Sequence, residues 1–180
     1  LGEQLGFRVL EDWYQLSQKT VLKWRGGGIL DYIGASPFAL LKDYRPDYEW
    51  QEWRLRNVPL GFWQQRANRR RYLDWLGQQL GFTQPEDWYQ LAKQHLEERH
   101  GRQLLVLFHS SPCAIVQDYL PQYRWLEWRF RQVRQGFWDV PANRQRYMRW
   151  LGQQVGFRRI EDWYQVTQRH FEQWDGGGLL

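Results

Sequence analysis

Arginine is the residue type in this sequence with the most evident chemistry, because arginines gather in two segments that contain few acids. No acidic residue lies between Glu52 and Asp74, and Asp139 is the one acid between Glu127 and Trp150. Guanidinium groups bind phosphate oxygens through paired hydrogen bonds, and aromatic faces nearby can stack on bases. Both segments therefore predict phosphate contacts, and the candidate residues are Arg54, Arg56, Arg66, Arg70, Arg71, Arg129, Arg131, Arg134, Arg146 and Arg149.

A structural role is the alternative for some of these basic residues. Arg69 and Arg144 fall close to the edge of the expected buried helix stripe, where they could pair with acids such as Asp43 and Asp118. Arg66 and Arg70 point roughly away from the stripe and are the better candidates for contact with a ligand, although a solvated helix face would show the same pattern. The tryptophans are more typical of a core than of a contact surface, because short helices need bulky residues between them.

Catalytic and metal-binding patterns are missing from the sequence. Glu11 and Asp12 recur as a carboxylate pair, but their place at a helix start beside the helix dipole explains them. The four histidines show no ligand spacing, and with Cys113 as the single cysteine this chain can form neither an internal disulfide nor a cysteine-based zinc site. We expect no enzyme active site in these 180 residues, no cofactor, no metal and no small-molecule substrate.

An internal repeat organises the chain. The motif LGEQLGF at 1–7 returns as LGQQLGF at 76–82 and as LGQQVGF at 151–157, an offset of 75 residues without a gap. Residues 1–75 and 76–150 are identical at about half of their positions, and each of the 13 tryptophans has a counterpart at this offset or, for Trp24 and Trp174, at twice this offset. The sequence therefore predicts a tandem repeat of about 75 residues in which the aromatic residues belong to the repeated design.

Glycine clusters suggest where the repeat units begin, because such clusters separate elements. They lie at 26–28, at Gly101 and at 176–178, and we interpret them as plain loops. The expected domains are the tail of a preceding repeat at 1–25, complete units at 26–100 and 101–175, and the start of a further repeat at 176–180. The sequence is therefore interpreted as a piece of a longer protein.

Each unit is expected to be mainly α, with about four short helices and an irregular tryptophan-rich segment. Ser36 and Pro37 form an N-cap and first-turn pair that begins a helix, and the pair recurs at 111 and 112. A longer helix is predicted from Asn68 to Gly81, and its copy runs from Asn143 to Gly156. The segment 48–63 between them fits neither helical nor strand periodicity.

Two further short helices complete the predicted unit. The motif EDWYQ, at 11–15, 86–90 and 161–165, begins one of them. Ser17 and Thr167 are expected to cap the other, which ends near the glycines. The middle copy has Ala92 at this position and should lose roughly 1 kcal/mol of capping energy.

Composition limits the class of protein. Hydrophobic residues make up 42% and charged residues 25%, as in globular proteins, and no apolar run is long enough to span a bilayer, so we expect no membrane partner. The net charge of +5 mildly favours an anionic partner. We expect an intracellular location, in the nucleus or an organelle, over secretion.

The order of motifs resembles a known type of module. EDWYQ, GGGLL, SPxA, WxxWRF, GFW and NRRRYLDWL together resemble a tryptophan- and arginine-rich helical repeat found in tandem in predicted proteins of algae, plants and large viruses, some of them related to homing endonucleases. The resemblance covers the whole chain and implies a DNA-directed accessory repeat. It carries no catalytic residues, and Gly101 to Gln103 depart from its three-glycine motif.

Three functional hypotheses follow. The first is a helical tandem-repeat protein that binds nucleic acid, with DNA preferred over RNA through the resemblance alone. The second is a protein-interaction or structural array in which tryptophans are buried between units and arginines pair with acids. The third is the substrate-gripping part of a nuclease whose catalytic domain lies outside this segment.

Overall fold

The computed structural model describes residues 2–32 and 36–180, and the protein is mainly helical. Helices account for 62% of the chain, and the described residues contain no strand, which confirms the mainly α prediction. The chain divides into two compact units, Leu1–Tyr72 and Leu73–Leu180, whose boundary falls inside helix α5 (Arg66–Leu80). These units differ from the repeat boundaries expected at 26–100 and 101–175, which stay a prediction.

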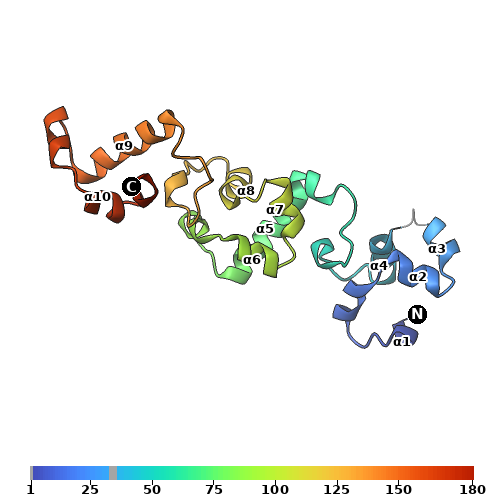
Figure 1. The fold of residues 1–180 in the computed structure, drawn as a ribbon. Coiled ribbons are helices and arrows are strands. Elements are labelled where there is room, and N and C mark those ends of the chain that lie inside the picture. Colours follow the sequence, from blue (N-terminus) through green and yellow to red (C-terminus); the bar gives the residue numbers. More distant parts are fainter. Residues whose placement is uncertain (1, 33–35) are drawn as a thin grey trace. The chain divides into compact units, whose positions relative to one another are not determined.

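Unit 1 is built from short helices and 3-10 turns (Figure 1). Helices α2 and α3 pack against each other. In chain order its elements are α1 (Gly2–Leu5), η1 (Leu10–Gln15), α2 (Gln18–Lys23), α3 (Gly27–Tyr32), α4 (Pro37–Tyr44), η2 (Glu52–Arg54), η3 (Phe62–Gln64) and the start of α5.

Unit 2 continues from α5 with the same kinds of element. Helix α7 packs against both α6 and α8. In chain order the elements are η4 (Pro85–Gln90), α6 (Lys93–Glu98), α7 (Arg102–Leu107), α8 (Pro112–Tyr119), η5 (Glu127–Arg129), α9 (Pro141–Val155), η6 (Ile160–Gln165), α10 (Gln168–Gln173) and η7 (Gly177–Leu179).

Local capping signals placed several helix ends correctly. The Ser36 hydroxyl accepts a hydrogen bond from Ala39 N, as Ser111 does from Ala114 N, so both predicted serine caps are confirmed. Ser17 likewise accepts from Thr20 N at 3.2 Å. The predicted stop of α9 is confirmed, because Gly156 takes up a left-handed conformation with φ of 87° that glycine adopts without steric cost.

Thr167 is the N-cap residue of α10, as predicted, but its side chain does not provide the cap. Its hydroxyl makes no capping bond to the backbone; instead His170 Nδ1 accepts a hydrogen bond from Thr167 N at 3.1 Å. The ring of His95 makes the same contact with Ala92 N at 3.3 Å. A histidine in the first turn therefore takes over part of the capping in these two helices.

The interpretation of the glycine clusters as plain loops is confirmed for Gly26 and Gly101, which lie just before helices, and is wrong for Gly27 and Gly28, which lie in α3. Gly27 lies in the first turn of α3, and Gly101 is the N-cap of α7. Glycine is tolerated at both places, because the first N–H groups of a helix need no intrahelical acceptor. Helix α7 is stabilised by Leu104 and Leu105, which are at most 4% exposed. Burial of these apolar side chains therefore outweighs the weak helix-start signal of the local sequence.

Tryptophan fills the core, as expected. The buried tryptophans are Trp50, Trp53, Trp63, Trp88, Trp125 and Trp128. In unit 1, Trp50 packs with Tyr14, Leu16, Val21, Leu41 and Leu55. In unit 2, Tyr147 and Leu151 of α9 pack with Trp128. The aromatic residues therefore hold short helices together, and few of them remain for contact with a partner.

Restoring a serine cap at Ala92 is expected to stabilise the protein. Ser17 provides such a cap at the equivalent position, whereas Ala92 makes no side-chain capping bond. Ala92→Ser should therefore raise the free energy of unfolding by about 1 kcal/mol in urea denaturation, and Ser17→Ala should lower it by a similar amount. An unchanged midpoint for both variants would contradict the capping argument.

The aspartate of each EDWYQ motif caps the start of its 3-10 helix. Asp12 Oδ2 accepts hydrogen bonds from Val9 N at 3.0 Å and Arg8 N at 2.7 Å, and Asp87 and Asp162 make the equivalent pairs. These bonds from backbone N–H groups favour the charged form, so they lower the pKa of all three carboxyl groups below the ordinary value of 3.8. The aspartate of each carboxylate pair therefore has a structural role.

The depressed pKa of Asp12 predicts a pH-dependent contribution to stability. The carboxyl group binds a proton less readily in the folded state than in the unfolded state. Its contribution to stability is therefore fully present above pH 3.8, and it is lost as the pH falls through the lower pKa of the folded state. Asp12→Ala should lower the melting temperature at neutral pH. The melting temperature of this variant should also fall less steeply with pH below about pH 4 than that of the unchanged protein. Glu11→Ala, at the exposed neighbouring position, should do neither.

Candidate nucleic-acid interface

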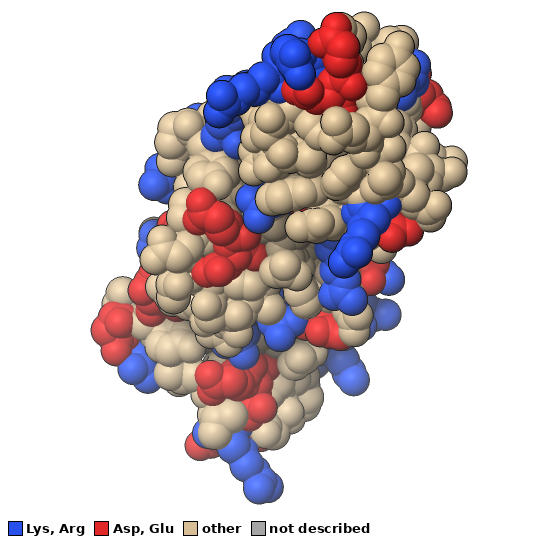
Figure 2. Space-filling view, turned by 90° about the vertical axis from the view of Figure 1, so that its left-hand side faces the viewer, with Lys and Arg blue, Asp and Glu red and all other residues tan. Residues whose placement is uncertain are grey.

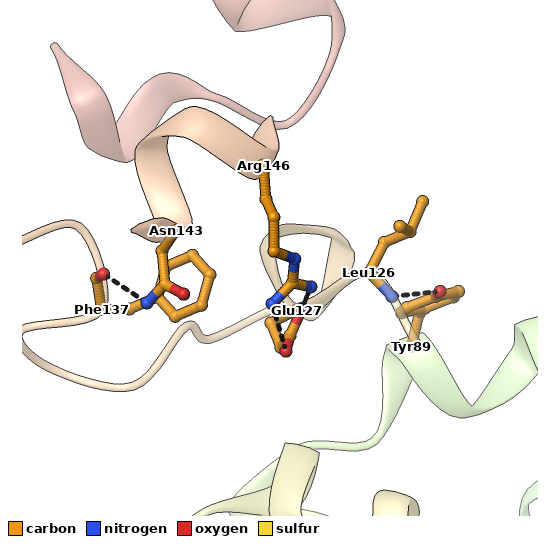
Figure 3. Close-up of polar contacts among 6 residues, drawn as sticks. All are labelled: Tyr89, Leu126, Glu127, Phe137, Asn143 and Arg146. Carbon is orange, nitrogen blue, oxygen red and sulfur yellow. Dashed lines mark hydrogen bonds and ion pairs between the residues drawn. The ribbon is translucent and has the colours of Figure 1, made fainter. Parts of the chain in front are cut away.

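Asn143 and Arg144 hold the turn that precedes α9. Asn143 Nδ2 donates to the Phe137 carbonyl at 2.9 Å (Figure 3), and Arg144 Nη1 donates to the Trp138 carbonyl at 2.5 Å. In unit 1 the same arrangement joins Asn68 to Phe62 and Arg69 to the carbonyls of Trp63 and Gln64. The structural interpretation of these two arginines agrees with the geometry, with main-chain carbonyls as their partners.

Two predicted phosphate contacts, Arg146 and Arg71, make ion pairs with acids of the chain at the protein surface. Both terminal nitrogens of Arg146 bond to the Glu127 carboxylate, at 3.3 and 2.5 Å (Figure 3), and its guanidinium lies 5.6 Å from the Trp128 ring. Arg71 pairs with Glu52 and covers Trp53 in the same way. The acid before each arginine segment, Glu52 or Glu127, therefore neutralises one arginine of that segment.

Arg54 and Arg129 lie on the faces of buried tyrosines. The guanidinium carbon of Arg54 is 4.3 Å from the Tyr14 ring centroid, and that of Arg129 is 4.7 Å from the Tyr89 centroid. Each tyrosine hydroxyl accepts a hydrogen bond from a backbone N–H, which for Tyr89 belongs to Leu126 at 3.0 Å (Figure 3). These cation–π contacts orient both arginines along the protein surface.

The remaining candidates are exposed. Arg66 lies at the start of α5, on its exposed side. The other five are Arg56, Arg70, Arg131, Arg134 and Arg149. Among the residues that the structure describes, no carboxylate oxygen lies within 4 Å of their guanidinium nitrogens. Arg56 and Arg131 are held by their backbones, because their N–H groups donate to the carbonyls of Tyr14 and Tyr89.

Arg134 contributes to a basic pocket of about 690 Å³ in unit 2. Three segments form it: the first residue of α6, the loop before α8 and the loop after η5. It has no acid in its lining, which consists of Lys93, His109, Ser110, Ser111, Pro112, Gln132, Val133, Arg134 and Gln135. Lys93 and Arg134 are exposed, and their cationic groups, with the hydroxyl and amide donors beside them, match the acceptor oxygens of phosphate.

Unusual backbone geometry shapes one wall of the basic pocket. His109 and Ser110 have φ values of 51° and 58°, in the left-handed region that non-glycine residues seldom adopt. Such residues persist only where the surrounding structure holds them. Ser110 N donates to the Leu105 carbonyl at 2.7 Å, which ties this wall to helix α7.

The basic pocket has no basic counterpart in unit 1. At the offset of 75 residues, Lys93 corresponds to Gln18 and Arg134 to Pro59. Sequence reasoning identified Arg134 but missed Lys93 and His109, because both lie outside the arginine segments. No sequence signal joins these segments; the fold brings them together.

On the face drawn in Figure 2, basic residues form separate groups that alternate with acids. Figure 2 shows groups of Lys and Arg side chains beside groups of Asp and Glu on the same face. The basic pocket of unit 2, by contrast, brings Lys93 and Arg134 together without an acid in its lining.

Other kinds of site find little support in the described part of the chain. It contains no group of three or more His, Cys, Asp or Glu side chains arranged to hold a metal ion, and none of its helices could cross a membrane. Burial raises the pKa of the Cys113 thiol to about 12, so this cysteine is protonated at neutral pH. Comparison with known proteins found no matching family model, no similar curated protein and no similar solved structure.

Proposed function

We propose that this protein binds nucleic acid, and that the basic pocket of unit 2 is its main phosphate-binding site. The observation that carries the proposal is the convergence of Lys93 and Arg134, from distant segments, on one pocket without an acid in its lining. Arg131 and Arg149, exposed and without an acidic partner among the described residues, supply further cations in the same unit. The net charge of +5 adds a long-range attraction for polyanions.

The proposal includes a tandem helical repeat of about 75 residues. Three 3-10 helices, η1, η4 and η6, begin at Leu10, Pro85 and Ile160, each 75 residues after the one before. Arg25, His100 and Asp175 keep the same offset and all have positive φ, of 61°, 66° and 59°. This agreement between sequence and backbone supports units at 26–100 and 101–175, each of which adds contacts along an extended ligand.

A protein-interaction array is the second candidate function. It is favoured by the arginines that are already engaged within the fold, and by apolar side chains on the surface such as Leu60, Val106 and Ile160, which are at least 70% exposed. The resemblance to homing-endonuclease-related proteins adds the third possibility, the substrate-gripping part of a nuclease, and is the reason to place DNA before RNA.

Fluorescence anisotropy tests the proposal. The chain is titrated against labelled duplex DNA, single-stranded DNA and RNA over a salt series from about 50 to 200 mM, a range in which phosphate contacts weaken steeply. We expect an affinity that falls linearly with salt concentration in a log-log plot, with the duplex bound best. Absence of binding to all three polymers at the lowest salt concentration would refute the proposal and leave the interaction array.

A further inference from the structure

A second pocket of unit 2 adjoins the basic pocket and has a different lining. It has a volume of about 300 Å³ and is lined by residues of α8, of the loop after η5 and of the start of α9. Phe108 and Phe137 belong to its lining, and we call it the phenylalanine pocket. The residues that line both pockets are His109, Ser111, Val133 and Arg134.

Comparison of the two repeat copies shows how this space arises. Cys113, which lines the phenylalanine pocket, has Phe38 as its counterpart in unit 1 at the offset of 75 residues. The Phe38 side chain packs against the core cluster of its unit, and a cysteine is too small to fill the same volume. Phe137 is partly exposed, whereas its counterpart Phe62 is only 4% exposed. Unit 2 therefore has an open, largely apolar space at Cys113, where unit 1 carries a large ring.

The polar side chains of the phenylalanine pocket suit the edge of a neutral ring. Asn143 Nδ2 donates to the Phe137 carbonyl, which leaves the amide oxygen of Asn143 as an acceptor. Gln117 adds an amide group with both donors and an acceptor. The charge of Glu127 is balanced, because its carboxylate pairs with Arg146. Aromatic side chains with amides beside them match a nucleobase, which has a flat face for stacking and hydrogen-bonding groups at its edge.

We propose that the phenylalanine pocket receives the base of an unpaired nucleotide whose phosphate is bound in the basic pocket. The base would pack against the phenylalanine rings, and its edge would form hydrogen bonds with Gln117 and Asn143. Arg134 lines both pockets and can hold the phosphate beside the base. This role rests on the proposed phosphate site and adds the kind of nucleotide that the site takes. A strand end or a tail is suitable, because a base must leave the helical stack before it can enter a pocket.

Small ligands test the two pockets separately. In ¹H–¹⁵N NMR titrations of the intact chain, the four nucleoside 5′-monophosphates are compared with ribose 5-phosphate, which has the sugar and the phosphate but no base. At least one nucleotide should bind about tenfold more tightly than ribose 5-phosphate, because its base stacks on aromatic side chains. The same nucleotide should shift the side-chain amide resonances of Gln117 and Asn143. Equal affinities for ribose 5-phosphate and all four nucleotides would overturn the proposal and leave the phosphate site in place.

A duplex with a single-stranded tail tests the proposal on nucleic acid. Fluorescence anisotropy compares it with a blunt duplex and with a duplex whose tail has the same number of phosphates on abasic sugars. The tail with bases should be bound about tenfold more tightly than the abasic tail, whereas the blunt duplex measures phosphate binding alone. If the blunt duplex binds and the two tails are bound equally, the base pocket is wrong and the proposed function stands. If no duplex binds, nucleic-acid binding itself is refuted, and the nucleotide titration alone decides whether the phenylalanine pocket takes a base.

Cys113→Phe closes the phenylalanine pocket with the side chain that unit 1 carries at this position. It should abolish the gain in affinity that the bases of the tail provide, and it should leave binding of the blunt duplex unchanged, because Cys113 does not line the basic pocket. Cys113→Ala is the matched control, since it keeps the pocket open and should bind the tailed duplex as the unchanged protein does. A full gain from the bases in folded Cys113→Phe would overturn the proposal. The comparison of nucleotides with ribose 5-phosphate needs no variant, so it tests the pocket even if Cys113→Phe does not fold.

Discussion

Tyr147→Ala is expected to lower the free energy of unfolding by about 3–5 kcal/mol, a large part of the stability of a chain of this size. The Tyr147 side chain is fully buried and lies between Trp128 and Trp138, with ring centroids at 5.5 and 5.3 Å. Its removal leaves a cavity that these two large and rigid rings cannot fill, and it leaves the Trp174 carbonyl without the tyrosine donor.

Urea denaturation followed by tryptophan fluorescence measures this effect. Tyr147→Phe keeps the ring and loses the hydrogen bond, so it should cost only about 1 kcal/mol. Tyr164→Ala is the matched control, because it removes the same side chain at a position that is 92% exposed, and it should change stability by less than about 0.5 kcal/mol. Equal losses for Tyr147→Ala and Tyr164→Ala would show that Tyr147 does not hold the core.

The three EDWYQ motifs show how far local sequence predicts structure. All three form six-residue 3-10 helices, each with an aspartate bonded to the preceding backbone N–H groups, because this geometry depends only on residues a few positions apart. Burial of the tyrosine differs between copies: Tyr14 and Tyr89 are 3% exposed, and Tyr164 is 92% exposed. Trp50 and Trp125 cover the first two from 36 residues further along the chain, a contact that local pattern does not report.

The roles of the arginines depended on tertiary contacts for the same reason. Sequence placed Arg71, Arg134 and Arg146 in one class of basic residue, but Glu52 and Glu127 engage two of them and leave Arg134 in the basic pocket. An arginine segment thus contains both structural and free side chains. The role of each arginine depends on whether the fold brings a carboxylate or a main-chain carbonyl close to its guanidinium group.

The glycines within the two long helices indicate close helix packing, a signal that the sequence analysis did not use. A Cβ atom at Gly152 would lie 2.7 Å from the Trp163 indole, and one at Gly77 would lie 3.0 Å from Trp88. Glycine inside a helix costs stability, so its recurrence two positions after a tryptophan indicates close approach of another element. The motif LGQQ therefore encodes the packing of a helix against the EDWYQ tryptophan.

Neutralising the basic pocket is expected to weaken nucleic-acid binding without unfolding the protein. Lys93→Gln combined with Arg134→Gln removes two exposed cations, so the free energy of unfolding should change by less than about 0.5 kcal/mol. The affinity for duplex DNA should fall at least about tenfold, because two charge-assisted contacts are lost. The slope of log affinity against log salt should decrease by about two, since each lost phosphate contact releases one fewer counterion.

A control with the same change in net charge separates a local site from long-range attraction. Lys19→Gln combined with Arg169→Gln also replaces one exposed lysine and one exposed arginine, and both positions lie outside the basic pocket. If Lys93 and Arg134 contact phosphate directly, the control should reduce affinity much less and leave the salt slope nearly unchanged. Equal losses in the two double variants would mean that DNA responds to the overall charge alone, and the basic pocket would then have no role in binding. A normal affinity in both variants would instead assign binding to other exposed arginines, of which Arg131 and Arg149 lie in the same unit.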